Sequence, residues 1–164
     1  MVNGLKKLFE DKVVIITGAA DGMGKKVALD MASEGAKISS IDINKEGIDS
    51  LKKEIEASGG QCITIKCDVS SSREITEMVQ HTMDAFKTID IVINSAGLLL
   101  TGGIEETSDE LIDKIININL KSVLYITREV APIMKEKRYG RIVNIASITG
   151  KRGDNTTLPV YGAS

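Results

Sequence analysis

Short apolar runs alternate with longer amphipathic segments along the whole of this 164-residue chain, and this alternation constrains the fold more than any other feature. Runs rich in β-branched residues predict buried strands, whereas apolar residues spaced by three and four predict helices with one buried face. Strands that alternate with helices form parallel sheets, because each helix carries the chain back across a face of the sheet. We therefore predict an α/β fold with a doubly wound parallel sheet.

The predicted strands cover residues 13–16, 36–42, 62–67, 90–94 and 141–146, and the predicted helices cover 22–34, 45–58, 71–86 and 107–137. Ser71 with Glu74, and Thr107 with Glu110, form capping boxes that predict where the last two helices begin. Pro132 lies inside the last helix and should kink or loosen it, because proline has no amide hydrogen to donate. We expect one domain, residues 1–164, with the Rossmann-type strand order 3-2-1-4-5.

Composition and charge argue against several functions. The formal net charge of −2 gives no basic surface of the kind that binds nucleic acid or an acidic membrane. No stretch approaches the ~20 apolar residues of a membrane span, and residues 1–12 lack a signal-peptide core, so we predict a cytoplasmic protein. Cys62 and Cys67 lie on one predicted strand and face opposite sides, which excludes a disulfide between them. His81 belongs to no cluster with metal-ligand spacing, so we predict no metal site.

Three glycines, Gly18, Gly22 and Gly24, lie in the turn between the first predicted strand and the first predicted helix. Glycine permits a sharp turn and a close approach of the backbone to a ligand. The helix that follows adds unpaired amides and the positive end of its dipole, which favour a phosphate group. A tight turn can also require glycine without any ligand. Between a strand and a helix, however, the pattern predicts a dinucleotide site.

The spacing G-x-x-x-G-x-G, together with further motifs in the same order, resembles the short-chain dehydrogenase/reductase family, in particular its 3-oxoacyl-carrier-protein reductase-like members. The family loop reads T-G-x-x-x-G-x-G. The resemblance implies an oxidoreductase that transfers a hydride between NAD(H) and a secondary alcohol or ketone, assembled as a homodimer or homotetramer. The motifs in this sequence are Thr17 to Gly24, Asp68-Val69, Asn94-Ser95-Ala96-Gly97, Asn119, Ser147 and Tyr161.

The choice of coenzyme depends on acidic side chains. Asp42 ends the second predicted strand, where a carboxylate can accept hydrogen bonds from both ribose hydroxyls and repel the 2′-phosphate of NADP. Asp21 adds negative charge, so we predict NAD rather than NADP. The alternative for Asp42 is a structural role in the turn. The residues predicted to contact the coenzyme are Gly18, Asp21, Gly22, Met23, Gly24, Asp42, Asp68, Val69, Asn94, Ala96 and Gly97.

The resemblance also implies how each later motif meets the coenzyme. Asp68 contacts the edge of the adenine and Val69 its face. The backbone of Asn94, Ala96 and Gly97 approaches the adenine ribose. The Asn94 side chain has an alternative role, which is to tie neighbouring strands together.

By the same resemblance, Tyr161 is the general acid and base, Ser147 orients the substrate oxygen, and Asn119 holds a water in the proton relay. A tyrosine hydroxyl has a free pKa of about 10 and needs a group that stabilises its anion. In the family this is a lysine four residues after the tyrosine, whereas the sequence ends at Ser164. We therefore expect a longer polypeptide, with the family's final strands and helices, and an inactive 164-residue form. A naturally truncated product, or a coenzyme-binding or assembly module without catalysis, is the alternative.

Overall fold

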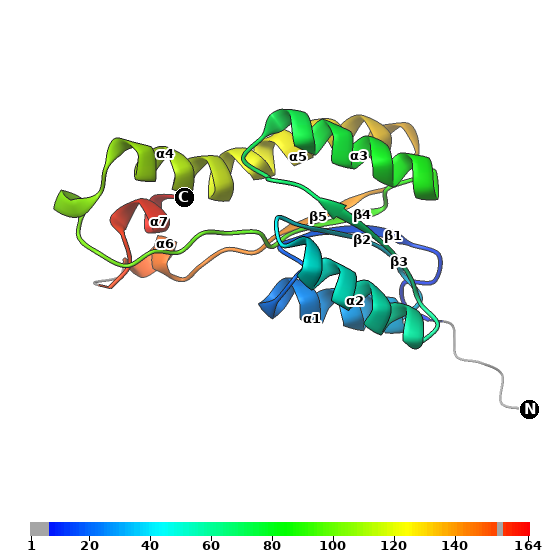
Figure 1. Cartoon of the computed structure of the whole chain (residues 1–164). Helices are drawn as coiled ribbons and strands as arrows, with labels where there is room; N and C mark the ends of the chain where they lie inside the picture. Colours follow the sequence, from blue (N-terminus) through cyan, green and yellow to red (C-terminus); the bar gives the residue numbers. More distant parts are fainter. Residues whose placement is uncertain (1–6, 154–155) are drawn as a thin grey trace, which may run out of the picture.

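The computed structural model describes residues 7–153 and 156–164. Its centre is a parallel sheet with the strand order β3-β2-β1-β4-β5. Helices α1 (Gly22–Ser33) and α2 (Lys45–Ala57) cover one face, and α3 (Ser72–Phe86) and α5 (Ser122–Glu136) cover the other (Figure 1). The predicted doubly wound fold and its strand order are confirmed. The strands are β1 (Val13–Thr17), β2 (Lys37–Asp42), β3 (Gln61–Lys66), β4 (Ile91–Asn94) and β5 (Arg141–Asn144).

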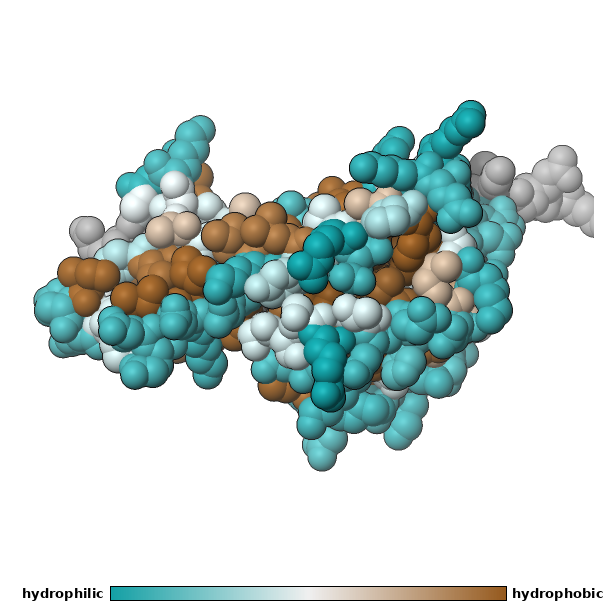
Figure 2. Space-filling view, turned by 90° about the horizontal axis from the view of Figure 1, so that it is seen from above, coloured by the Kyte–Doolittle hydropathy of each residue, from teal (hydrophilic) through white to brown (hydrophobic). Residues whose placement is uncertain are grey.

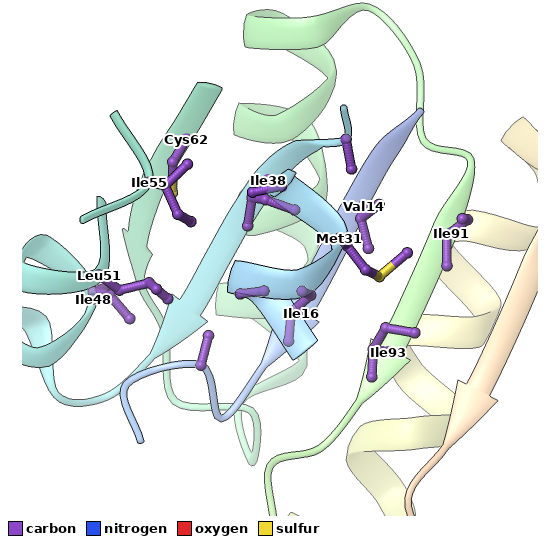
Figure 3. Close-up of a cluster of buried hydrophobic side chains, with 14 residues drawn as sticks. Val14, Ile16, Met31, Ile38, Ile48, Leu51, Ile55, Cys62, Ile91 and Ile93 are labelled. Atoms are coloured by element: carbon purple, nitrogen blue, oxygen red, sulfur yellow. The ribbon is translucent and has the colours of Figure 1, made fainter. Parts of the chain in front are cut away.

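Two apolar cores lie on the two faces of the sheet, because neighbouring residues of a strand point to opposite sides. Ile16 packs in the core beneath α1 and α2 (Figure 3), whereas its neighbour Ile15 packs in the core beneath α3 and α5. Each fully buried side chain of this size stabilises the fold by about 1.5–3 kcal/mol relative to an exposed one. Cys62 belongs to the first core and Cys67 to the second, so the two thiols lie on opposite faces, as predicted, and both are free.

The segment predicted as one helix over residues 107–137 consists of three parts. These are α4 (Asp109–Ile116), a π-helical segment η2 (Asn117–Lys121) and α5. The predicted cap is wrong by one residue, because the Ser108 hydroxyl accepts from the Leu111 amide while the Thr107 hydroxyl donates to the Gly103 carbonyl. Helix α5 continues through Pro132, so the departure from α-helical hydrogen bonding occurs at η2 rather than at the proline.

Three short elements near the carboxyl ends of the strands complete the described structure (Figure 1). These are η1 (Ile104–Glu106), α6 (Thr149–Arg152) and α7 (Pro159–Ala163). Leu158 and Val160 pack with Ile115 of α4, which holds α7 in place. Tyr161 therefore lies on a helix that is anchored to the rest of the molecule.

Strand β5 forms one edge of the sheet and is largely exposed. Its Val143 is 45% exposed, and Ile145, just beyond the strand, is 39% exposed. Helices α1 and α2 pack mainly against β1, β2 and β3.

Candidate functional site

The glycine-rich turn uses glycine for its backbone angles at Gly18 and Gly22 and for close packing at Gly18 and Gly24. Gly18 and Gly22 have positive φ angles of 66° and 55°, which residues with a Cβ rarely adopt. A Cβ on Gly24 would lie 2.2 Å from the carbonyl oxygen of Gly18, so the turn closes against the first turn of α1. A Cβ on Gly18 would lie 2.9 Å from the backbone of Ala96, so the turn also contacts the loop after β4.

The turn leads directly into the N-terminus of α1. The amides of Met23 and Gly24 lie in the first helical turn, where no preceding residue of the helix can accept from them. The carboxylate of Asp21 caps the helix by accepting from the Gly22 amide at 2.7 Å, and it is exposed. The structure thus offers two helix amides to an anion and places one carboxylate beside them.

Asp42 ends β2 and binds backbone on both sides. Its Oδ2 accepts from the amide of Ala20 at 3.0 Å, and its Oδ1 accepts from the amide of Asn44 at 2.9 Å. Asn44 in turn caps α2 by accepting from the Gly47 amide. The structural role that was the alternative for Asp42 is therefore present. Each carboxylate oxygen keeps a second lone pair, which can accept from a ribose hydroxyl.

The loop after β4 is fixed by side chains of neighbouring strands. The buried hydroxyl of Thr17 accepts from the amides of Ser95 and Ala96, both at 3.1 Å. The side chain of Asn94 donates to Asn144 Oδ1 at 2.8 Å, so it ties β4 to β5 as its alternative role required. Because Asn94 is 4% exposed, any contact with a ligand here would come from the loop that follows it.

Asp68 and Val69 follow β3 in a short turn. The Asp68 carboxylate accepts from both the amide and the hydroxyl of Ser70. The backbone amide of Asp68 donates to the carboxylate of Glu74. Val69 is 7% exposed and belongs to the core beneath α3. Both residues therefore have structural roles, and the half-buried Asp68 carboxylate retains accepting capacity for a ligand.

A pocket of about 470 Å³ opens at this edge of the sheet. It brings together six of the predicted site residues, while the other predicted coenzyme contacts do not line it. Its remaining walls come from the loop after β5 and from the start of α5. The predicted residues that line it are Met23, Ala96, Gly97, Asn119, Ser147 and Tyr161.

Asn119 lies in η2 and binds the backbone across the pocket. Its Oδ1 accepts from the Leu98 amide at 2.8 Å, and its Nδ2 donates to the Leu98 carbonyl at 3.1 Å and to Ser164 Oγ at 2.9 Å. Both amide hydrogens are therefore committed, and one lone pair of Oδ1 remains for a water. The side chain therefore links η2 to the loop after β4 through two hydrogen bonds to Leu98.

Ser147 is exposed and its hydroxyl is engaged within its own turn. It donates to Thr149 Oγ1 at 3.1 Å and accepts from the Thr149 amide at 3.2 Å. Tyr161 is half-buried in α7 and lines the same pocket. To contact a substrate oxygen, the Ser147 hydroxyl must exchange its bond to Thr149 for one to the substrate.

Sequence reasoning missed the part played by Asn144, which lines the pocket and receives the hydrogen bond from Asn94. The available signal was two asparagines that end neighbouring strands at the same edge of the sheet. Among residues 7–153 and 156–164, no group of side chains could hold a metal ion. In the same part of the chain, no helix is long and apolar enough to cross a membrane.

Comparison with known proteins identifies relatives of nearly the whole chain. Residues 12–164 match the family model described as short chain dehydrogenase. The 3-oxoacyl-[acyl-carrier-protein] reductase FabG of Thermotoga maritima is 39% identical over 155 residues, which cover 94% of this chain and 63% of the relative. This chain thus spans less than two thirds of the length of that relative, and 56% of a (2S)-[(R)-hydroxy(phenyl)methyl]succinyl-CoA dehydrogenase subunit from Thauera aromatica, which is 38% identical.

Solved structures show the same arrangement. A metagenomic short-chain oxidoreductase in complex with NADP superposes with a TM-score of 0.90 at 29% identity, covering 94% of this chain and 70% of the other. An NAD⁺-bound xylitol dehydrogenase superposes with a TM-score of 0.90 at 28% identity, covering 96% and 60%. The similar proteins thus include complexes with either nicotinamide dinucleotide.

Proposed function

This chain belongs to the short-chain dehydrogenase family, and on that premise we propose that it is the coenzyme-binding part of an NAD(H)-dependent oxidoreductase. The reaction would interconvert a secondary alcohol and a ketone of a small molecule. The observation that carries the proposal is the convergence of Met23, Ala96, Ser147 and Tyr161, from four separate segments, on one pocket beside the glycine-rich turn.

The residues present fit a dinucleotide. Gly18 and Gly24 let the turn pack against the loop after β4 and against itself, whereas a Cβ on Gly22 would meet no atom within 4 Å. The open side of the turn, which a diphosphate can approach, is therefore at Gly22 beside the N-terminus of α1. The amides of Met23 and Gly24 and the positive end of the α1 dipole favour its negative charge. A nicotinamide coenzyme, when bound there, supplies or accepts the hydride. The nearby loop after β4, with Ala96 and Gly97, would hold the ribose.

We propose NAD rather than NADP on the basis of charge. Asp42 stands at the carboxyl end of β2, where its remaining lone pairs can accept from ribose hydroxyls. A 2′-phosphate at the same place would meet this carboxylate, and the exposed carboxylate of Asp21 adds to the repulsion. We assign Asp68 and Val69 to the adenine, with Val69 contributing through its backbone because its side chain is buried.

In the proposed chemistry, the Tyr161 hydroxyl gives a proton to the substrate oxygen in reduction and takes it back in oxidation. The Ser147 hydroxyl donates a hydrogen bond to the same oxygen once it leaves Thr149. Asn119 keeps one lone pair for a water that would connect Tyr161 to solvent. We propose that residues 1–164, tested by themselves, show no turnover, because the lysine that the family places four residues after the tyrosine is not among them.

We also propose that the protein is a homodimer or homotetramer. On the side of the molecule that carries α3 and α5, apolar side chains reach the surface among polar ones (Figure 2). Leu124 of α5 is 58% exposed, which suits a helix face that packs against another subunit. Sedimentation equilibrium would test this assembly. A cytoplasmic location stays a prediction.

Calorimetry with NADH and NADPH tests the proposed function. We expect the 164-residue chain to bind NADH, and to bind it more tightly than NADPH. Absorbance of NADH with a panel of ketones should then show no turnover by this chain. Failure to bind either dinucleotide would contradict the proposal. Binding without turnover by the complete gene product would favour the second candidate, a coenzyme-binding or assembly module.

A further inference from the structure

Asp42 connects three segments at the carboxyl end of β2. One carboxylate oxygen accepts from the amide of Ala20 in the glycine-rich turn, and the other accepts from the amide of Asn44 at the start of α2. The adjacent amide of Ala19 donates to the carbonyl of Ile41, so two successive amides of the turn are bound to the end of one strand. Hydrogen bonds to an ionised carboxylate are stronger than those to neutral acceptors.

The other side of Ala20 is also fixed. A Cβ placed on Gly47 would lie only 2.7 Å from the Cβ of Ala20, so Ala20 packs directly against the first turn of α2. Asn44 holds that first turn by accepting from the Gly47 amide at 3.1 Å. Asp42 therefore fixes both the turn and the helix against which the turn packs, and it does so without any ligand.

We infer that Asp42 is a positioning residue, which holds the glycine-rich turn in its binding shape before the coenzyme arrives. Asp42 then affects coenzyme binding in two ways, through its contact with the ribose and through the shape of the turn. If Asp42 acted only on the ribose, removing it would weaken NADH binding and strengthen NADPH binding, because the repulsion of the 2′-phosphate would disappear. Since both coenzymes place their diphosphate on the same turn, loss of Asp42 loosens the site of both, and for NADPH this loss offsets the relief of the 2′-phosphate repulsion. This consequence for the coenzymes rests on the proposed function, whereas the ordering of the free turn does not.

Hydrogen exchange of the ligand-free protein, resolved to single amides, tests the ordering of the turn. In Asp42→Ala, the amide of Ala20 should exchange roughly 10-fold faster or more than in the unsubstituted chain, because it loses a charged acceptor. The matched control is Asn44→Ala, which removes the α2 cap but leaves the acceptor of Ala20 in place. In the control the Gly47 amide should exchange faster while Ala20 stays protected. Unchanged exchange of Ala20 in Asp42→Ala would overturn the inference.

A second variant keeps the test decisive if Asp42→Ala does not fold. Asp42→Asn keeps the shape of the side chain but has one acceptor oxygen, so it can satisfy only one of the amides of Ala20 and Asn44. At least one of these two amides should then lose protection. If both keep their protection, the carboxylate does not hold the turn.

Calorimetry of Asp42→Ala supplies the coenzyme arm. We expect the affinity for NADH to fall roughly 10-fold or more and the affinity for NADPH not to rise. A rise in NADPH affinity together with unchanged exchange of the Ala20 amide would overturn the inference and leave Asp42 as a contact of the ribose alone. If the unsubstituted chain binds neither coenzyme, the proposed function fails, and the exchange of Ala20 still decides whether Asp42 orders the turn.

Discussion

Asn94 donates a hydrogen bond from Nδ2 to Oδ1 of Asn144 over 2.8 Å, and this bond joins the carboxyl ends of β4 and β5. The two residues are also partners in the register of the sheet. The loop with Ala96 and Gly97 follows one of them, and the loop with Ser147 follows the other. The pair therefore fixes the spacing of two walls of the proposed coenzyme pocket.

Asn144→Ala should lower the free energy of unfolding by about 1–3 kcal/mol, because it leaves the buried carboxamide of Asn94 without its partner. Urea unfolding followed by circular dichroism measures this change. The control is Val143→Ala in the same strand, where the side chain is 45% exposed, and a smaller loss is expected there. Equal decreases of the free energy of unfolding in the two variants would show that the Asn94–Asn144 hydrogen bond stabilises the fold no more than the exposed Val143 side chain does.

Lys137 binds polar groups at the amino end of the sheet, opposite the pocket. Its ammonium group donates to Asp90 Oδ1 at 2.6 Å, to Thr88 Oγ1 at 2.8 Å and to the carbonyl of Ile89. Asp90 also accepts from the amide of Val13 at 2.9 Å, so it links β1 to the start of β4. With side-chain exposures of 25% for Lys137 and 11% for Asp90, solvent screens this pair only in part.

Lys137→Met should therefore destabilise the fold by about 1–3 kcal/mol, because it leaves the Asp90 carboxylate partly buried without a cation. Thermal unfolding measures the loss. Lys135→Met on the exposed face of the same helix is the control, and its effect should stay within about 0.5 kcal/mol. A loss in the Lys135 variant as large as that in the Lys137 variant would mean that general charge, and not the Asp90 contact, matters.

Gly24→Ala should disrupt the glycine-rich turn, because its Cβ would lie 2.2 Å from the carbonyl oxygen of Gly18. We expect NADH affinity to fall at least tenfold and the melting temperature to drop. Gly97→Ala is the matched control for stability, since a Cβ at Gly97 would meet only Asn119 Oδ1 at an ordinary 3.7 Å. If Gly24→Ala melts and binds NADH as the unsubstituted chain does, the described turn is not the binding conformation.

The two buried thiols predict a pH dependence of stability. Burial raises the pKa of Cys62 and of Cys67 from 9.0 to about 12. Above pH 9 the thiols of the unfolded chain ionise, while those of the folded chain stay protonated until about pH 12. The stabilisation that comes from the two buried protonated thiols should therefore be fully present below pH 9. The free energy of unfolding should then fall as the pH rises from 9 to about 12.

Urea unfolding at about pH 8 and about pH 10.5 measures this dependence. The double variant Cys62→Ala, Cys67→Ala lacks both thiols and retains the titration of lysines and tyrosines. Its loss of stability between the two pH values should be smaller than that of the unsubstituted chain. An identical loss would show that the thiols do not contribute.

The strands of the sheet could be predicted from the sequence because each strand is defined by residues that are neighbours in the chain. Runs such as Val13 to Ile16 are apolar on both faces, as a parallel strand covered by helices must be. The turn from Thr17 to Gly24 could be predicted for the same reason, since the spacing of its glycines reflects the positive φ angles of Gly18 and Gly22. The two cysteines were placed correctly by the alternation of side chains along a strand.

Features that depend on distant contacts could not be predicted. The π-helical segment around Asn119 lies where that side chain is stapled to Leu98, a residue 21 positions earlier on another segment. Thr107 and Ser108 have equivalent capping chemistry in the sequence, and the choice between them depends on the use of the Thr107 hydroxyl by Gly103. Likewise, the bond between Asp42 and Ala20 appears only once β1 and β2 lie side by side.

A crystal structure of this chain with NADH tests most directly the central claim, which is that the backbone from Thr17 to Gly24 binds the diphosphate of a nicotinamide coenzyme. The account predicts diphosphate density against the N-terminus of α1, with the ribose of the adenosine half beside Asp42. NADH bound elsewhere at full occupancy, with the turn left empty, would contradict it.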